Sequence, residues 1–512
     1  MEGFSSKTFI RVLSNKYEHM EHQKQRVGPP SEIIKVSDTI WEIPKTYKKG
    51  MRVPARIIAS EDLINAMDAG VFEQVTNVAT LPGIQEYAYC MPDGHWGYGF
   101  PIGGVAAFDP KEGGIISPGG IGFDINCGMR LITTNLTEEE VKPKIRELVD
   151  ALYMKVPAGV GCKGFVKITK DEFKEVMVDG AQWCLTNGYA TEHDIEHIEN
   201  RGKIEGADVS AVSEKAIKRG FDQIGTLGSG NHYLEIQVVD EKNVHDWDAA
   251  KVMGITKPGQ VVIMVHCGSR GFGHQIGTDY LRQFLEVMPK YNIEIRDREL
   301  ACAPFNSPEG QSYYKAMACA ANMAFANRQV ILHRIREVFS RVFDKTAEEM
   351  EMKLVYDVAH NIAKLEKHTI DGVEKELLVH RKGATRAFGP SRGDDLPDDY
   401  KTIGQPIILG GSMETGSWLL LGTDTADETF ASTAHGAGRI MSRMAAKNKF
   451  KAEDLLKKME LKGIYVHPVT MKGVAEEAGG AYKDVNSVVD SLEKAGITKK
   501  VVSLRPIGNV KG

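Results

Sequence analysis

The sequence lacks the features that mark membrane and secreted proteins. No stretch of its 512 residues approaches the roughly 18 consecutive apolar residues of a membrane span, and the longest apolar runs, near residues 261–265 and 418–421, are far shorter. The first 17 residues mix polar, basic and apolar side chains and contain no apolar signal core. We therefore expect a cytoplasmic protein with no membrane contact.

Paired cysteines, common nucleotide-binding motifs and an excess of positive charge are absent too. The seven cysteines are scattered, odd in number and never spaced C-x-x-C, which favours reduced thiols and argues against a disulfide framework or a zinc knuckle. Neither a P-loop nor a dinucleotide-binding glycine motif is found. With 64 Lys and Arg against 69 Asp and Glu, the net charge is −5, so any contact with nucleic acid must use a local patch.

The composition predicts a large folded protein. Hydrophobic residues make up 42% and charged residues 26%, the balance of an ordinary globular chain. Length alone suggests about three domains. However, the polar residues suited to catalysis or ligand binding are spread from 124 to 511, and no linker separates them. We therefore predict one large α+β domain of mixed sheets with surrounding helices over residues 51–512, preceded by a polar N-terminal segment over residues 1–50.

Periodicity and capping signals place the elements. Apolar or alternating runs predict strands at residues 103–108, 128–134, 231–239, 260–266, 353–359, 407–411 and 417–421. Helices are predicted at residues 61–70, from the capping box Thr137-x-x-Glu140 to about 156, and at 170–185, 308–343, 452–461 and 485–495. A further helix is expected to follow His435-Gly-Ala-Gly and to run to about Asn448.

Histidines recur where a rigid element is predicted to pass into a loop, which is where ligand and catalytic groups usually lie. His232 starts a strand, His266 and His360 end strands, and His435 is placed at a helix start. Asp124 and Cys127 lie three residues apart in the glycine-framed turn F-D-I-N-C-G. Together, Asp124, Cys127, His232, His266 and His360 form a plausible two-metal set in which the Cys127 thiolate bridges. Taken singly, each residue is explained as well by a structural histidine, an inert buried cysteine or a turn cap.

Glycine-rich turns and arginines suggest phosphate binding. The turn Gly436-Ala437-Gly438 is a candidate phosphate cradle at a helix start, and Gly410-Gly411-Ser412, with Ser417 nearby, resembles a second. Close helix packing explains such glycines equally well. Arginines beside these loops would form the local positive patch that a phosphate-bearing polymer needs. They are Arg219, Arg270, Arg439 and Arg443. Arg443 could equally be an ordinary surface residue.

Other polar residues are ambiguous. Asp93 and His95 of P-D-G-H-W-G could line the site, or could simply shape a loop. His193 and His197 have the i, i+4 spacing of a metal pair, but they lie among acidic residues with no third ligand in view, so we expect a solvated helix face.

Seven long motifs in order make the chain from about Leu81 to Gly512 resemble the RtcB-type RNA-splicing ligases. They are G-I-G-F-D-I-N-C-G, L-G-S-G-N-H-Y-L-E, H-C-G-S-R-G-F-G-H, Y-D-V-A-H-N, H-R-K-G-A-T-R-A-F, H-G-A-G-R and L-R-P-I-G-N-V-K-G. In the nearby G-G-S-M-E-T-G-S, Glu414 stands where we would expect a small residue.

The resemblance implies a specific reaction. Such ligases join RNA that ends in a 2′,3′-cyclic phosphate or 3′-phosphate to RNA with a 5′-hydroxyl, in tRNA splicing and RNA repair, using GTP and two Mn²⁺ ions, and an archease-type protein can activate them. By resemblance, Asp124, Cys127 and His232 hold one ion, and Cys127, His266 and His360 hold the other. His435 becomes guanylylated.

The resemblance also implies a guanylate pocket drawn from several motifs. Its residues are Asn231, His232, Tyr233, Leu234, Glu235, His360, Asn361, Gly410, Gly411, Ser412, Met413, Ser417, His435, Gly436, Ala437, Gly438 and Lys511.

Two other functions remain open from the residues alone. A binuclear metallophosphoesterase would need the metal-type residues but neither His435 nor Lys511. A noncatalytic RNA-binding scaffold would need only the arginine patch.

Overall fold

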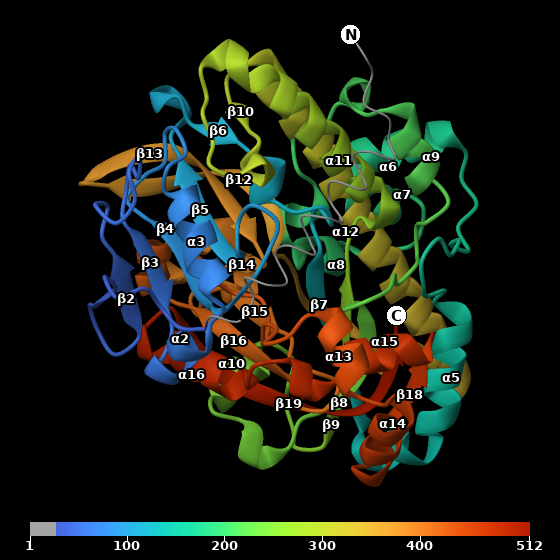
Figure 1. The fold of residues 1–512 in the computed structure, drawn as a ribbon. Coiled ribbons are helices and arrows are strands. Elements are labelled where there is room, and N and C mark those ends of the chain that lie inside the picture. The colour runs from blue at the N-terminus through green and yellow to red at the C-terminus, as the bar shows by residue number, and fades with distance from the viewer. Residues whose placement is uncertain (1–26) are drawn as a thin grey trace.

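Two large mixed sheets, with helices around them, form the molecule. The computed structural model describes residues 27–512 (Figure 1), so the first part of the polar segment predicted over residues 1–50 lies outside the described residues. The sheets and helices confirm the predicted α+β fold in a single large domain. In the described part of the chain, no helix is both long enough and apolar enough to cross a membrane. All seven cysteines are free thiols, as predicted.

The first sheet has seven strands in the order β1-β2-β3-β4-β5-β13-β12 and lies at one side of the molecule (Figure 1). Its strands are β1 (Ile34–Lys35), β2 (Ile40–Ile43), β3 (Ala55–Ile58), β4 (Ala88–His95), β5 (Ile102–Phe108), β13 (Val373–Lys382) and β12 (Asn361–Ile370). Its core also includes side chains from α2 (Glu61–Ala66), α3 (Ala69–Val78) and α16 (Val485–Lys494). The edge strand β1 and its neighbour β2 come from residues before position 51.

The second sheet has eight strands, seven of them in the order β11-β7-β9-β8-β19-β16-β15, with β18 paired to β19. These strands are β11 (Lys353–Ala359), β7 (Gly128–Thr137), β9 (Gln260–Cys267), β8 (Tyr233–Val238), β19 (Thr498–Lys511), β16 (Ser417–Gly422), β15 (Pro406–Leu409) and β18 (Tyr465–Pro468). Two small ladders join β6 (Ile115–Ile116) to β10 (Ala303–Pro304), and β14 (Ala384–Arg386) to β17 (Ser432–Ala434).

Helices gather mainly around the second sheet. One core joins it to α5 (Ile145–Lys155), α6 (Lys170–Asp179), α7 (Ala181–Thr186), α9 (Glu214–Gly220), α11 (Arg270–Val287) and α12 (Pro308–Phe343). A small separate core joins α14 (Ala452–Leu461) to α15 (Met471–Glu476). Helix α15 also contacts α13 (Arg443–Lys449). Short helices complete the chain: α4 (Glu138–Val141), α8 (Glu192–Glu196) and α10 (Trp247–Val252).

Helix α12 supports the strands that carry the site. It has the predicted bounds because the Ser307 side chain accepts a hydrogen bond from Gly310 N and Pro308 stands in the first turn. Its middle is buried continuously from Ala316 to Leu332 and includes Asn327 and Arg328. Polar side chains of this kind must find partners inside the protein, and they find them on the backbone beneath the strand ends.

Three predicted helices are divided in the structure. The helix predicted from Thr137 to about residue 156 becomes α4 and α5, with a 3-10 turn at residues 142–144 between them. The helix predicted over residues 61–70 ends at Ala66, and α3 begins after Asp68, whose side chain accepts a hydrogen bond from Gly70 N. The helix predicted over residues 170–185 breaks at Gly180, which has φ +56°. A Cβ at that position would lie 2.3 Å from the carbonyl oxygen of Gly202, so only glycine fits there.

Candidate active site

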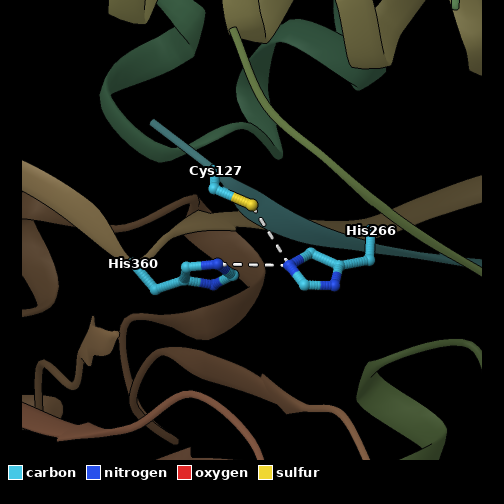
Figure 2. A group of neighbouring side chains, drawn as sticks. All are labelled: Cys127, His266 and His360. Atoms are coloured by element: carbon cyan, nitrogen blue, oxygen red, sulfur yellow. Dashed lines mark hydrogen bonds between the residues drawn. The ribbon is translucent and has the colours of Figure 1, made fainter. Parts of the chain in front are cut away.

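Five side chains with metal-binding chemistry meet at one edge of the second sheet. Cys127 Sγ lies 3.4 Å from His232 Nε2 and 3.2 Å from His266 Nε2. His266 Nε2 lies 3.2 Å from His360 Nε2, and His232 Nε2 lies 2.9 Å from Asp124 Oδ2. Figure 2 shows the side chains of Cys127, His266 and His360 pointing toward one another. The ligand atoms form two triads, Asp124–Cys127–His232 and Cys127–His266–His360, each with all atoms within 4.8 Å of one another. The Cys127 thiol belongs to both triads, as the sequence predicted.

The order of the strands explains this convergence. The neighbours β11, β7, β9 and β8 run antiparallel, so the end of one strand lies beside the start of the next. His360 follows β11, Cys127 precedes β7, His266 stands near the end of β9 and His232 precedes β8. The sheet therefore places all four at one edge although they are far apart in sequence.

The cluster has the donor chemistry of a divalent metal site. Its thiol, imidazole and carboxylate groups suit transition metals. The Nδ1 atoms of His232 and His360 are buried without a hydrogen-bond partner, whereas His266 Nδ1 lies 3.0 Å from the carbonyl oxygen of Asn231, a contact that orients the ring. Burial, with positive charge nearby, lowers the pKa of His266 and of His360 well below the usual value, so both rings are neutral and able to bind a metal.

His435 lies directly beside this cluster. It follows β17, and its ring centroid is 4.7 Å from that of His360. Its Nδ1 lies 2.6 Å from Asp93 Oδ2, and the same oxygen accepts hydrogen bonds from the backbone nitrogens of His435 and Gly436. An Nδ1–H that donates to Asp93 leaves the Nε2 lone pair free. The site therefore places an oriented imidazole next to the cluster of candidate metal ligands.

Two details of this region differ from the sequence predictions. Asp93, which the sequence left ambiguous, is fully buried at the end of β4 and orients His435. His435 does not start a helix, because α13 begins only at Arg443, after the Ser442 cap. The Gly436–Gly438 turn is thus a loop rather than a helix start.

A cavity of about 810 Å³ joins His435 to the cluster. Most of the predicted nucleotide-binding residues line its wall: Asn231, Tyr233, Glu235, His360, Asn361, Gly410, Gly411, Ser412, Met413, His435, Gly436, Ala437, Gly438 and Lys511. The wall also contains residues that sequence reasoning missed, among them Glu477, Tyr482, Lys483 and Asn509.

Three predicted nucleotide-binding residues lie outside the wall. Leu234 is fully buried in the core that contains α12, because β8 turns alternate side chains to opposite faces. Ser417 accepts a hydrogen bond at Oγ from Gln237 Nε2, which also donates to Glu235, so Ser417 supports the wall from behind. The His232 side chain belongs to the metal-type cluster. His232 precedes β8, which begins at Tyr233. The alternation of side chains along β8 therefore does not set the direction of the His232 side chain.

Glu235 and Lys511 are the charged groups of the wall that the resemblance assigns to the guanylate pocket. Glu235 accepts hydrogen bonds from Gln237 (2.5 Å) and Asn509 (2.6 Å), and burial raises the pKa of its carboxyl to about 7. Burial lowers the pKa of Lys511, whose Nζ lies 3.8 Å from the Glu477 carboxylate. The predicted pocket residues therefore contribute a carboxyl group at Glu235 and an amino group at Lys511 to the cavity wall.

Comparison with known proteins gives the family. The family model described as "tRNA-splicing ligase RtcB" matches residues 74–512. The chain belongs to the RtcB family. Among relatives named tRNA-splicing ligase RtcB, that of Methanococcus maripaludis is 52% identical over 483 residues, covering 94% of this chain and all of the relative. That of Thermococcus kodakarensis is 54% identical over 474 residues, covering 92% of this chain and 97% of the relative.

The structure explains why the charged residue Glu414 is tolerated in the G-G-S-M-E-T-G-S segment. Glu414 does not line the cavity. Its carboxylate lies 2.6 Å from Lys458 Nζ and accepts a hydrogen bond from Gly479 N. The 410–417 loop of this RtcB chain is thus tied to α14 from outside the cavity.

The four predicted RNA-binding arginines divide into two pairs. Arg439 and Arg443 line the cavity, and both contact Glu477. Arg219 and Arg270 are not among the lining residues. Arg270 donates to Gly159 O and Thr226 Oγ1, and Arg219 donates to Gln275 Oε1.

The predicted solvated face at His193 and His197 is wrong in part. The two rings stack with centroids 4.0 Å apart, and His197 is buried.

Proposed function

We propose that the protein is a GTP- and Mn²⁺-dependent RNA ligase that joins a 2′,3′-cyclic phosphate or 3′-phosphate RNA end to a 5′-hydroxyl RNA end, in tRNA splicing or RNA repair. The observation that carries this proposal is the His435 ring, oriented by Asp93 and 4.7 Å from His360, in a cavity large enough for a nucleotide. The names of the relatives support RNA ligation. Covalent labelling with GTP tests the proposal directly.

His435 is the proposed nucleophile. With Nδ1–H held by Asp93, Nε2 attacks the α-phosphorus of GTP, pyrophosphate leaves, and a phosphoramidate bond forms to guanylate. The guanylate then passes to the RNA 3′-phosphate, which becomes an activated electrophile. The 5′-hydroxyl attacks it and GMP leaves. A cyclic phosphate must first be opened by water.

Asp124, Cys127 and His232 would hold one Mn²⁺ ion, and Cys127, His266 and His360 would hold a second. Bound there, the ions would supply positive charge that neutralises phosphate oxygens and orients in-line displacement. These donors bind zinc at least as tightly by intrinsic affinity, so metal titration should compare the two ions.

We propose that the Glu235 carboxylate accepts a hydrogen bond from the guanine edge of GTP. Replacing Glu235 with glutamine is therefore expected to weaken GTP labelling about 10- to 100-fold. It should also change stability. The folded pKa of about 7 exceeds the unfolded value, so the folded state binds more protons and stability falls as pH rises through 7. Without ligands, the melting temperature of the variant relative to wild type should therefore rise between about pH 5 and about pH 8.

The exposed Glu241→Gln variant is the matched control for this measurement. A Glu235→Gln protein whose relative melting temperature does not change with pH would contradict the assignment of a raised pKa to Glu235.

One guanidinium joins the segments that carry the cluster. Fully buried Arg328 donates from Nη1 to Asn126 O (2.7 Å) and Cys267 O (3.0 Å), and from Nη2 and Nε to the Asp357 carboxylate (2.7 and 2.8 Å). Asn126 and Cys267 are sequence neighbours of Cys127 and His266, and Asp357 lies on β11, three residues before His360. Arg328 therefore fixes the backbone from which the Cys127–His266–His360 triad projects.

Arg328→Met is expected to lower the free energy of unfolding by about 3–5 kcal/mol, because a buried ion pair is broken. It should also weaken metal affinity about 10- to 100-fold, since outer-shell contacts orient ligands. Denaturant unfolding and calorimetric metal titration measure the two effects, and Arg328→Lys provides a milder variant.

The matched control for Arg328 is Arg336→Met. Arg336 lies on the same helix and pairs with Asp194 (2.6 Å), and it also donates to Met352 O, eight residues before His360. The Arg336→Met variant should lower stability and leave metal affinity unchanged. Equal metal affinity in wild type and Arg328→Lys would contradict the positioning role.

RNA is the proposed partner, and an archease-type protein is a proposed activator. A binuclear metallophosphoesterase is the second candidate, because both triads are present. The Asp93–His435 pair favours the ligase, since hydrolysis at two metals needs no separate oriented imidazole.

A further inference from the structure

Three aromatic rings from three of the glycine-rich segments have no part in the chemistry proposed above. Tyr98 comes from W-G-Y-G, Phe123 directly precedes Asp124, and His274 ends H-C-G-S-R-G-F-G-H. Tyr98 and Phe123 line the same cavity as His435 and the metal-type cluster. Their position beside Asp124 calls for an explanation.

The three rings contact one another in a row, which we name the aromatic ledge. Phe123 and His274 are stacked, with centroids 5.0 Å apart and planes at 27°. Tyr98 meets Phe123 edge-on at 5.1 Å. Tyr98 and Phe123 are half-buried, whereas His274, on α11, is exposed. The aromatic ledge thus leads from the cavity wall to the protein surface.

Core packing does not explain this arrangement. On the same helix, Phe272 meets Phe173 with centroids 5.2 Å apart, and both rings are fully buried. That pair is what a structural aromatic contact looks like here. His274 lies two residues further along and leaves a ring at the surface, where a flat face is open to a ligand.

The charge around the aromatic ledge suits a nucleotide. Burial, together with the positive charge of Arg219, lowers the pKa of His274, so its ring is neutral near pH 7. Arg219 donates to Gln275, the residue after His274, which places a guanidinium beside the outer end of the aromatic ledge. An aromatic face for a base with an arginine for its phosphate is the usual combination at single-stranded nucleic-acid sites.

We propose that the aromatic ledge binds the nucleobase of a terminal nucleotide of RNA, stacked on His274, while the phosphate or hydroxyl of that nucleotide reaches the cavity past Phe123. The inference rests on the proposed function in taking RNA as the ligand. The base belongs to one of the two ends to be joined, and the experiment below has an arm for each.

The test uses RNA with 2-aminopurine as its terminal base, because stacking on an aromatic ring quenches the fluorescence of this base. One arm carries it at the end with the 3′-phosphate and the other at the end with the 5′-hydroxyl. In one arm we expect wild-type protein to quench the fluorescence of 2-aminopurine. In the same arm, His274→Ala should weaken RNA binding about 5- to 150-fold and should no longer quench this fluorescence. His274→Phe keeps a flat ring and should restore both binding and quenching.

The matched control is His245→Ala, because His245 is also exposed beside an aromatic ring, with its centroid 5.2 Å from that of Trp418, yet does not line the cavity. It should bind both RNAs like wild type. Wild-type behaviour of His274→Ala in both arms would overturn the proposal, and so would a His274→Phe protein as weak as His274→Ala. Labelling of wild-type protein by GTP without RNA tests the ligase proposal separately, since it does not involve the aromatic ledge.

Discussion

The His435→Ala protein is expected to take up no covalent label from GTP radiolabelled at its α-phosphate, whereas unchanged protein becomes labelled in the presence of Mn²⁺. The Nε2 atom of His435 combines a free lone pair, a fixed ring orientation and a place beside the cluster of candidate metal ligands. Loss of a nucleophile removes the covalent step altogether, so labelling should fall by at least about a thousandfold. Denaturing electrophoresis measures the bound label, which should be acid-labile.

His333→Ala is the control for this experiment, because His333 is half-buried on α12 and does not line the cavity. It should label like wild type. A wild-type protein that stays unlabelled but opens a cyclic phosphate would replace the ligase with the metallophosphoesterase.

The ligand cluster could be predicted because its signals are local. Asp124 and Cys127 share one glycine-framed turn, and each histidine stands at the boundary of a strand that periodicity detects. What the sequence could not show is the strand order β11-β7-β9-β8, which brings these boundaries to one edge. Pairing of distant strands leaves no trace in a local pattern.

The partner of His435 could not be predicted for the same reason. Asp93 and His435 are separated by 342 positions, and their contact exists only because β4 and the loop after β17 meet. The P-D-G-H segment was a signal, but it was equally consistent with a shaped loop. Tyr482 lies in no recognised motif, and Asn509 lies in the terminal L-R-P-I-G-N-V-K-G motif at a position that no local pattern marked as a cavity residue.

The predicted helix start at His435 failed for a steric reason. Gly438 has φ +73°, and a Cβ at this position would lie 2.0 Å from the carbonyl oxygen of Asp93. The glycine is needed for this close approach of two backbones, which a regular helix would prevent. The chain becomes helical only at Arg443, once Ser442 supplies a cap. Gly438 therefore indicated close contact with the Asp93 segment rather than the start of a helix.

Replacing Cys127 with alanine is expected to remove bound metal and to abolish labelling by GTP. The Cys127 thiol belongs to both triads, so its loss leaves each with two ligands. Cys302→Ala, which removes a buried thiol from the other core, should keep both properties. Metal analysis after gel filtration gives the stoichiometry, and an unchanged stoichiometry in Cys127→Ala would mean that the thiol does not bridge.

The pH dependence of metal affinity tests independently whether the Cys127 thiolate binds the metal. Burial, with Asp124 nearby, raises the pKa of the Cys127 thiol to about 12, so the metal-free site holds this proton and metal must displace it. Metal affinity of the wild-type protein should therefore rise from about pH 6.5 to about pH 8, because the thiol proton must leave when metal binds. A wild-type metal affinity that does not change over this pH range would place the metal away from Cys127.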